Sequence, residues 1–390
     1  MCFCVCVIGP PGGKLRFLKF DVAHAQKFVD FLKGLLIVLL HLLFQIISLS
    51  RHRIPVCVCV CDAETRVHEM YGLGKVKSMN ATGGGAYKYA DLAKKELGIE
   101  FVQHDEMQCL VRGMNYLLQH SDSELFYVRG DDEGASGGCC DPAAAEPSSG
   151  ATAPSPKLSR VVGAAPAPKR EIPAVPAEQV FVSARKRPSL FPYTVVNVGS
   201  GVSVLKITGP ESFERVSGSG IGGGTFWGLT RLLTKFTDFS QVIEQCQPGH
   251  ADEGQVDFLV GDVYGAGNAN PIGLDPTLTA SYFGKIQRSG PSDMYRDADI
   301  AKSLLHMVSD NVAEIGWLVS QIEKTQLVVF CGGFLLDNQC VWQLITKSMC
   351  YWSHGTQKAL FLAHDGYLGA LGALLADRPP QQPEPVKPDR

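Results

Sequence analysis

Residues 193–229 read YTVVNVGSGVSVLKITGPESFERVSGSGIGGGTFWGL, and this stretch decides the fold class. Two runs rich in β-branched residues, 194–198 and 202–207, predict strands joined through a short Gly-Ser-Gly turn. A second glycine cluster at 218–224 leads into a helix predicted over 225–233. Strands followed by a glycine loop and a helix are typical of α/β proteins whose loops approach a ligand closely.

Predicted strands and helices also follow one another in the rest of the chain. Apolar residues at three- and four-residue steps over 297–322 predict a long amphipathic helix whose stripe belongs to the core. The remaining predicted elements are strands over 76–80, 258–263 and 327–330 and helices over 87–97, 106–118 and 367–375. Strands that alternate with helices predict an α/β protein.

Composition places the chain among ordinary globular proteins. It has 390 residues, of which 45% are hydrophobic and 19% charged, with a formal net charge of -3. This length has room for two domain-sized cores. The charge balance provides no field that favours nucleic acid or an acidic membrane surface, so we expect neither as a partner.

Changes in composition divide the chain into segments. Residues 130–190 are rich in Ala, Pro, Ser and Gly and bury too little apolar surface to fold, which predicts a disordered insertion within one fold. The other predicted segments are an aberrant start over 1–75, the rest of a first lobe over 76–129, a second lobe over 191–377 and a Pro-rich tail over 378–390.

Cysteines near the start alternate with Val or Phe in two runs, at Cys2, Cys4 and Cys6 and at Cys57, Cys59 and Cys61. Alternation would send three thiols to one face of a strand, which allows a soft-metal site, although metal ligands are usually separated by two residues. Alternating Cys and Val codons also match a TG dinucleotide repeat, so translated non-coding DNA is the favoured hypothesis. A transcript that carries both tracts in frame would refute it.

An apolar run over 35–49 reads LLIVLLHLLFQIISL. It is shorter than the roughly 20 apolar residues of a membrane-spanning helix, and it contains His41 and Gln45. It also lacks the flanks of a signal peptide. Aberrant translation or a buried helix is the favoured interpretation, and a membrane anchor is the alternative.

Four glycine turns lie at the ends of predicted strands. They contain Gly83, Gly84 and Gly85, then Gly199 and Gly201, then Gly222, Gly223 and Gly224, and finally Gly332 and Gly333. Each alone is better explained as a tight turn, since none matches the P-loop or the dinucleotide fingerprint. Several in one α/β chain favour phosphate or nucleotide binding, because glycine lets backbone N–H groups approach phosphate. No pairing of His with carboxylates indicates a metalloenzyme.

Ordered motifs along the chain resemble those of the eukaryotic-type pantothenate kinases. They are ATGGGAYK at 81–88, HDEMQCLV at 104–111, the stretch from Tyr193 to Leu229, VGDVYG at 260–265, SYFGK at 281–285, CGGF at 331–334 and HDGYLGA at 364–370. The resemblance implies an α/β fold of the actin-like ATPase superfamily, with two lobes, a nucleotide between them and the first lobe incomplete. It also implies transfer of the γ-phosphate of ATP to pantothenate, the first step of coenzyme A synthesis.

Roles for individual residues follow from the same resemblance. Glu106 matches the catalytic base that takes the proton of the substrate hydroxyl; without the resemblance it would be an exposed acid at a helix start. Ser200, Ser203 and Arg215 match residues that bind pantothenate or acyl-CoA, because the Arg fork grips carboxylate or carbonyl oxygens. Trp352 matches an aromatic residue of the CoA site, with a core aromatic as the alternative.

The cofactors implied are ATP and Mg²⁺. Of the glycine turns, those at 83–85, 222–224 and 332–333 are assigned to the nucleotide, or to shaping the cleft around it. The partners implied are pantothenate as substrate, acyl-CoA as feedback regulator and a second copy of the chain in a homodimer.

The start of the chain departs from the family pattern. These kinases begin with a strand and an Asp-Ile-Gly-Gly-Thr-like turn followed by a Lys, which hold the ATP phosphates, and this chain lacks that turn. The nearest fragment, 12–17, resembles a later strand. We therefore expect the first lobe to lack its opening hairpin, at the cost of most activity.

Three functional hypotheses follow from these residues. The favoured one is an active pantothenate kinase. The second is a pseudokinase that binds acyl-CoA or pantothenate and acts as a regulatory or dimerisation partner. The third is a regulator tethered to a membrane through 35–49. Without an evident targeting peptide the expected compartment is the cytoplasm, with the nucleus as an alternative, and a phosphatase-like domain could follow the tail, as in some relatives.

Overall fold

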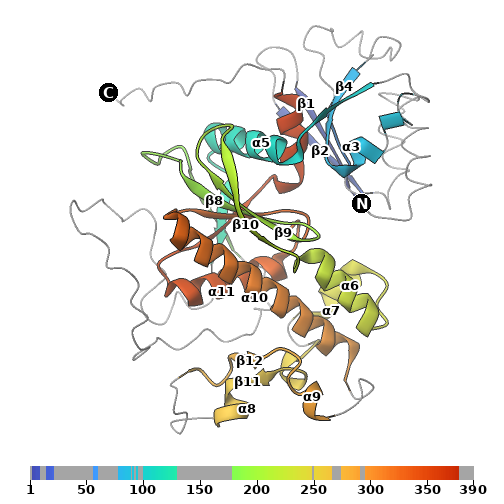
Figure 1. Cartoon of the computed structure of the whole chain (residues 1–390), viewed down its shortest axis with the longest axis vertical. Helices are drawn as coiled ribbons and strands as arrows, with labels where there is room; N and C mark the ends of the chain where they lie inside the picture. The colour runs from blue at the N-terminus through green and yellow to red at the C-terminus, as the bar shows by residue number, and fades with distance from the viewer. Residues whose placement is uncertain are drawn as a thin grey trace, which may run out of the picture.

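The computed structural model describes residues 2–8, 15–21, 56–59, 78–88, 90–91, 94, 100–129, 178–247, 250–265, 274–289 and 295–376. Figure 1 shows a large sheet in the middle of the molecule and a smaller sheet toward the N-terminal end. The helices are α3 (Gly84–Lys88), α5 (Glu106–His120), α6 (Gly223–Leu233), α7 (Phe239–Gln245), α8 (Val260–Tyr264), α9 (Ile286–Ser289), α10 (Asp297–Glu323), α11 (Gln339–Ser353) and α12 (Leu368–Leu374), with 3-10 turns at Glu253–Gln255 and Asp365–Tyr367.

The large sheet has seven strands in the order β10-β9-β8-β13-β14-β6-β7. They are β6 (Leu125–Val128), β7 (Gln179–Val182), β8 (Tyr193–Val198), β9 (Val202–Ile207), β10 (Phe213–Ser219), β13 (Val328–Cys331) and β14 (Ala359–Leu362). β8, β9 and β10 are antiparallel neighbours, whereas β13 runs parallel to both β8 and β14. The carboxyl ends of β8, β13 and β14 therefore point in the same direction and lie side by side at one end of the strands.

Both faces of the large sheet are covered by helices. Val196 and Phe330 belong to the face that packs against α10 and α11, whereas Tyr193, Val195 and Val329 belong to the face that packs against α5 and α12. This division follows from the alternation of side chains along a strand. It also explains why these strands read as nearly continuous apolar runs. The expected α/β fold class is confirmed.

The smaller sheet has five strands in the order β2-β1-β3-β4-β5. They are β1 (Cys2–Ile8), β2 (Leu15–Asp21), β3 (Val56–Cys59), β4 (Ser78–Thr82) and β5 (Glu100–His104). The first Cys-Val tract and the described part of the second, with Cys57 and Cys59, form strands here. β1 runs parallel to β3, with Cys4 opposite Cys57 and Cys6 opposite Cys59 in backbone register. Helix α12 contacts β1, β3 and β4 as well as α5, so α12 connects the two sheets.

The expected loss of an opening hairpin needs a correction. β1 and β2 form an antiparallel hairpin, from Cys2 opposite Asp21 to Ile8 opposite Leu15. The residues that join the two strands, 9–14, lie outside the described part and contain no Asp or Glu. What the chain lacks relative to the family pattern is therefore the acidic turn sequence, not the hairpin.

Most predicted elements appear with small boundary shifts, but the strand predicted over 258–263 is wrong. Only Phe258–Leu259 is a strand, and α8 begins at Val260. The Asp262 carboxylate accepts a hydrogen bond from the backbone N–H of Leu259 at 2.9 Å. A carboxylate at this position caps a helix N-terminus, and it ends the strand that the apolar residues alone would favour.

The Ala- and Pro-rich insertion is also shorter than its predicted span of 130–190. Residues 178–190 are part of the described structure, and β7 pairs with β6 at the edge of the large sheet. Val180 and Val182 pack against the apolar core. These two side chains provide the buried apolar surface that the Ala- and Pro-rich residues around them lack. Residues 130–177, the apolar run over 35–49 and the tail over 378–390 lie outside the described residues.

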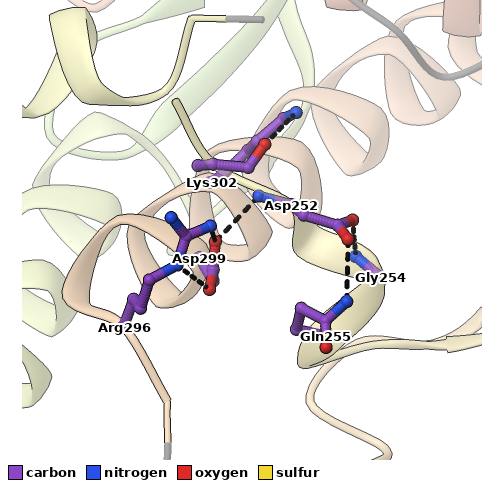
Figure 2. Close-up of polar contacts among 7 residues, drawn as sticks. Asp252, Gly254, Gln255, Arg296, Asp299 and Lys302 are labelled. Carbon is purple, nitrogen blue, oxygen red and sulfur yellow. Dashed lines mark hydrogen bonds and ion pairs between the residues drawn. The ribbon is translucent and has the colours of Figure 1, made fainter. Parts of the chain in front are cut away.

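Helix α10 extends beyond the large sheet toward a small subdomain made of α8, α9 and the two-stranded sheet β11 (Phe258–Leu259) and β12 (Thr279–Ser281) (Figure 1). Figure 2 shows the polar contacts at the start of α10. The Asp299 carboxylate, which is 2% exposed, accepts from Arg296 at 2.6 and 2.9 Å and from the Asp252 N–H at 2.8 Å. Lys302 donates to Ala251 O at 3.0 Å. These bonds attach the segment before β11 to α10.

None of the helices in the described ranges is long and apolar enough to cross a membrane.

Candidate active site

The smaller sheet places two predicted site segments next to each other. β4 and β5 are parallel, with Thr82 opposite His104 at their carboxyl ends. The Thr82 hydroxyl donates to His104 O at 3.0 Å across this edge. Gly83, whose φ of 83° favours glycine, follows β4, and Glu106 follows β5 after one residue. The first glycine turn and the candidate base therefore emerge at the same edge, where α/β proteins bind ligands.

Glu106 is the first residue of α5, and Asp105 caps this helix. The Asp105 carboxylate accepts from the N–H of Gln108 at 2.8 Å, as an N-cap residue does. Glu106 is still accessible to solvent, yet the protein around it removes part of its hydration. That loss of hydration, and second the negative charge of Asp105, raise the pKa of the Glu106 carboxyl. A raised pKa makes the carboxylate a better proton acceptor.

The start of α5 meets the large sheet at Asn197. Met107 Sδ accepts from Asn197 Nδ2 at 3.8 Å, and Asn197 lies opposite Ser203 in the pairing of β8 with β9. Asn197 Oδ1 is also 2.6 Å from the position that a Cβ on Gly332 would occupy. The helix that begins with Glu106 therefore contacts the carboxyl end of β8, and Asn197 in turn lies against the Gly332 turn that follows β13.

The turn at 222–224 packs directly against the turn at 199–201. Gly223 N donates to Gly199 O and Gly224 N donates to Ser200 O, both at 2.9 Å. A Cβ on Gly222 would lie 2.8 Å from the backbone of Gly201. These glycines are therefore required by the close approach of two backbone segments. The N–H groups of Gly223 and Gly224 are used within the protein and are not available to a phosphate. The geometry therefore supports a role of this turn in shaping the cleft better than direct contact with the nucleotide.

Gly332 and Gly333 have different surroundings. Gly332 has a φ of 110°, and its N–H donates to Asp365 Oδ2 at 2.7 Å. A Cβ on Gly332 would lie 2.6 Å from Val198 O, whereas the Cβ position of Gly333 is open. Gly332 is thus fixed by its neighbours, and Gly333 is the residue of this pair that a ligand can approach.

A buried carboxylate holds the segment that carries Asp365. Glu124 is 0% exposed, and it accepts from the His364 N–H at 3.1 Å and lies 2.6 Å from His364 Nδ1. Both carboxylate oxygens are therefore used by one residue. A buried carboxylate needs such partners because burial without them is costly. The pair fixes the chain just before Asp365 and, through Asp365, the turn at Gly332.

Arg215 and Ser203 lie on adjacent strands of the β9–β10 hairpin. Gly218 is opposite Ser203, and the Arg215 guanidinium is 2.5 Å from the position that a Cβ on Gly218 would take. The absence of a side chain at Gly218 therefore leaves room for Arg215 beside Ser203. A β-bulge between Arg215 and Ser217 allows the strand to place Arg215 there. Ser200, in the turn between β8 and β9, is exposed.

Trp352 is not brought together with these residues. Its ring stacks on Trp317 of α10, with centroids 6.1 Å apart and an interplanar angle of 20°. Trp352 is near the end of α11, and the following Gln357 donates to Thr325 O and Gln326 O, just before β13 begins. Ser200 comes after the carboxyl end of β8, which is parallel to β13, whereas Trp352 lies near the amino end of β13. Within one chain, Trp352 and Ser200 therefore lie at opposite edges of the sheet.

A pocket of about 160 Å³ lies beyond the Gly332 turn. Its walls include Phe126, Trp342 and Phe361, and its polar lining includes Asp337 and Asp365. Among the described residues there is no group of three or more His, Cys, Asp or Glu side chains that could hold a metal ion.

Comparison with known proteins shows which family the chain belongs to. The model of the family described as Fumble matches residues 9–376. The chain belongs to the Fumble family. It is 34% identical over 366 residues to "Pantothenate kinase" of Schizosaccharomyces pombe, which covers 93% of this chain and 72% of that protein. The predicted relation to the eukaryotic-type pantothenate kinases is thereby confirmed.

Other Fumble-family relatives are much longer than this chain. "Pantothenate kinase 2" of Arabidopsis thaliana is 34% identical over 367 residues, covering 94% of this chain and 33% of that protein. "4'-phosphopantetheine phosphatase" of Mus musculus is 32% identical over 364 residues, with 93% and 34% covered. The chain therefore spans about a third of the length of these curated relatives.

Two parts of this Fumble-family site were not predicted from the sequence. Asn197 lies between Met107 of α5 and the Gly332 turn, and Asp365 holds Gly332. Asp365 stands in a motif that carried the resemblance, so that motif could have marked it. Asn197 sits in an apolar strand, and a polar residue just before a glycine turn was the only signal for it.

Proposed function

We propose that this chain is an ATP-dependent pantothenate kinase that phosphorylates the primary hydroxyl of pantothenate. The observation that carries the proposal is the position of Glu106. It begins α5 just after β5, and the next residue, Met107, contacts Asn197, which pairs with Ser203. The names of the Fumble-family relatives point to the same reaction.

In the proposed reaction Glu106 accepts the proton of the pantothenate hydroxyl. The hydroxyl oxygen then bonds to the γ-phosphorus of ATP while the bond to the bridging oxygen breaks, and ADP leaves. Phosphoryl transfer depends mainly on positioning the reactants and on neutralising charge. The only proton transfer that it needs is from the hydroxyl, and one carboxylate of raised pKa can accept that proton. The base works only when it is deprotonated.

Arg215, Ser203 and Ser200 are the proposed contacts of pantothenate. Pantothenate carries a carboxylate, and the guanidinium fork suits a planar, bidentate pairing with it. The bulge and Gly218 leave the Arg215 guanidinium beside Ser203, which supports this assignment. Trp352 is left out of the proposed site, since it stacks on Trp317 at the other edge of the sheet.

The nucleotide is proposed to lie along the glycine turns at 83–85 and 332–333, with Gly222–Gly224 keeping the neighbouring backbones close. ATP carries Mg²⁺, which neutralises phosphate charge when it is bound. Mg²⁺ usually takes one or two carboxylates together with phosphate oxygens. Asp365, at the Gly332 turn, is the acidic side chain proposed for such a role.

Regulation, assembly and location are proposed on the resemblance alone. Acyl-CoA would compete for the pantothenate contacts, and the active form would be a homodimer in the cytoplasm. Inhibition by acetyl-CoA with pantothenate varied, and the mass of the purified protein in solution, test the first two points. Inhibition that pantothenate cannot relieve, or a monomeric active form, would contradict them.

The reaction is tested with purified chain, Mg-ATP and pantothenate, followed by mass detection of the phosphorylated product. The expected result is product formation, with the KM for pantothenate raised about tenfold or more in Arg215→Ala, because a bound carboxylate loses a charged partner. Arg185→Ala serves as control, since Arg185 is exposed and pairs with Asp122 at 3.6 Å. Product from a hexose instead of pantothenate, or an unchanged KM in Arg215→Ala, would contradict the proposal.

A further inference from the structure

Three polar side chains lie on one face of α5 because they are spaced by four and by three residues: Gln108, Arg112 and Asn115. All three contact the turn that joins β9 to β10. Gln108 Nε2 donates to Glu211 O at 3.1 Å, and Arg112 Nε donates to Glu211 Oε1 at 2.7 Å. Asn115 Nδ2 donates to Pro210 O at 2.8 Å. The proposed function leaves these bonds without a role.

The bonds are partly shielded from water and tie in further neighbours. Asn115 is 2% exposed, and its Oδ1 accepts from the hydroxyl of the fully buried Tyr193 at 2.7 Å. The Arg112 guanidinium also donates to Gly372 O of α12 at 3.3 Å. Buried polar groups keep specific partners because an unpaired one is costly. The contacts therefore define one position of α5 relative to the turn.

The two elements that these bonds join carry the two halves of the proposed chemistry. Helix α5 begins with Glu106, less than one turn before Gln108. The β9–β10 hairpin carries Ser203 and Arg215, the proposed contacts of pantothenate. Whatever sets the position of α5 on the hairpin turn therefore also sets the distance from the base to the bound hydroxyl.

We propose that Gln108, Arg112 and Asn115, with Glu211 as their partner, are positioning residues that hold Glu106 at the correct distance from bound pantothenate. This inference rests on the proposed function. None of the four touches the reacting atoms in this account. A displacement of about 1 Å at a reacting centre can cost roughly a hundredfold in rate, so the positions of these residues matter for turnover.

The test exchanges the charges of the Arg112–Glu211 pair. Arg112→Glu and Glu211→Arg are each expected to lower kcat about tenfold or more, because like charges push α5 away from the turn. The Kd of pantothenate, held by the hairpin alone, is expected to change less than about twofold. The double variant restores an attractive pair and is expected to recover most of the lost kcat.

The matched control is the pair Arg129–Glu178 between β6 and β7, which has the same 2.7 Å separation and does not involve α5. The single variants Arg129→Glu and Glu178→Arg are expected to keep the wild-type kcat. A kcat that is unchanged in the Arg112 and Glu211 single variants would overturn the inference, as would a double variant no better than either single.

A second measurement does not depend on activity. Hydrogen exchange in Arg112→Glu is expected to be faster at the amides of Gly209 and Ser212, which bond to each other's carbonyls across the turn. Unchanged exchange there would overturn the inference even if the rate fell. A wild-type chain that phosphorylates no pantothenate would overturn the proposed function instead, and exchange would still decide whether Arg112 holds the turn.

Discussion

Asp105 and Glu106 are adjacent carboxylates at the start of α5, and titration distinguishes their roles. The pKa of Glu106 is raised, first by lost hydration and second by the charge of Asp105. Because the base must be deprotonated, kcat should fall as the pH decreases through that raised pKa. Asp105→Asn removes the charge but keeps a good N-cap. It should therefore move the acid limb of the kcat–pH profile to lower pH, and a limb that stays in place would contradict this.

The same pKa shift predicts how stability responds to the loss of Glu106. A folded-state pKa above the unfolded value means that the folded chain holds its proton more tightly, so stability falls as pH rises through that window. At neutral pH the ionised Glu106 is thus slightly unfavourable for folding. Glu106→Gln should keep or slightly raise the thermal midpoint at neutral pH, measured by circular dichroism. A clearly lower midpoint would mean that Glu106 has a structural role.

Gly218 gives a further prediction at the residue scale. An added methyl group would lie 2.7 Å from Val202 O and 2.5 Å from the Arg215 guanidinium, so the strand or the Arg must shift. Gly218→Ala should raise the KM for pantothenate about tenfold, with a smaller change in the KM for ATP. Gly228→Ala is the matched control, because nothing lies within 4 Å of its Cβ position. Equal effects on both substrates would argue against a specific role of Arg215.

The crossing of α5 and α12 depends on two glycines. A Cβ on Gly113 would lie 2.1 Å from Leu368 O, and one on Gly372 would lie 1.8 Å from Cys109 O. Gly113→Ala should destabilise the protein by about 1–3 kcal/mol or more, the usual cost of overpacking. Chemical denaturation measures this, and Gly228→Ala should change stability little or raise it, since Ala favours helix. A neutral Gly113→Ala would show that the two helices can separate.

Elements with local signals could be predicted from the sequence. The predicted strand over 202–207 matches β9, and the predicted helix over 297–322 matches α10 to within one residue, because period-two and helical patterns are local. The strand over 258–263 fails because the Asp262 cap competes with the apolar pattern. β7 was missed because its stability comes from pairing with β6, which is about fifty positions away.

The sequence proposed which residues form the candidate site, but it could not give their arrangement in space. The sequence identified the glycine turns, yet only the fold separates Gly332, fixed by Asp365 and Val198, from the open Gly333. The sequence likewise could not show that Trp352 and Ser200 lie at opposite ends of the strands, because the order and direction of the strands are not visible in it. The polar stripe on α5 has helical spacing, but its partner turn lies about a hundred residues further along the chain.

At the scale of the whole molecule, the proposed site lies where the two sheets meet. The smaller sheet supplies the edge from which Glu106 emerges, and the large sheet supplies the hairpin with Ser203 and Arg215. Helices α5 and α12 connect them. The account therefore predicts that catalysis needs both sheets, whereas pantothenate binding needs chiefly the large one.

The most direct test measures phosphopantothenate formed by the purified chain from Mg-ATP and pantothenate, beside Glu106→Gln and a Glu244→Gln control on the exposed side of α7. We predict one phosphopantothenate per ADP for the wild type and the control. In Glu106→Gln we predict a rate at least about a hundredfold lower, as expected when a general base is lost. A folded wild type that makes no phosphopantothenate, or a Glu106→Gln variant that keeps the wild-type rate, would contradict the account.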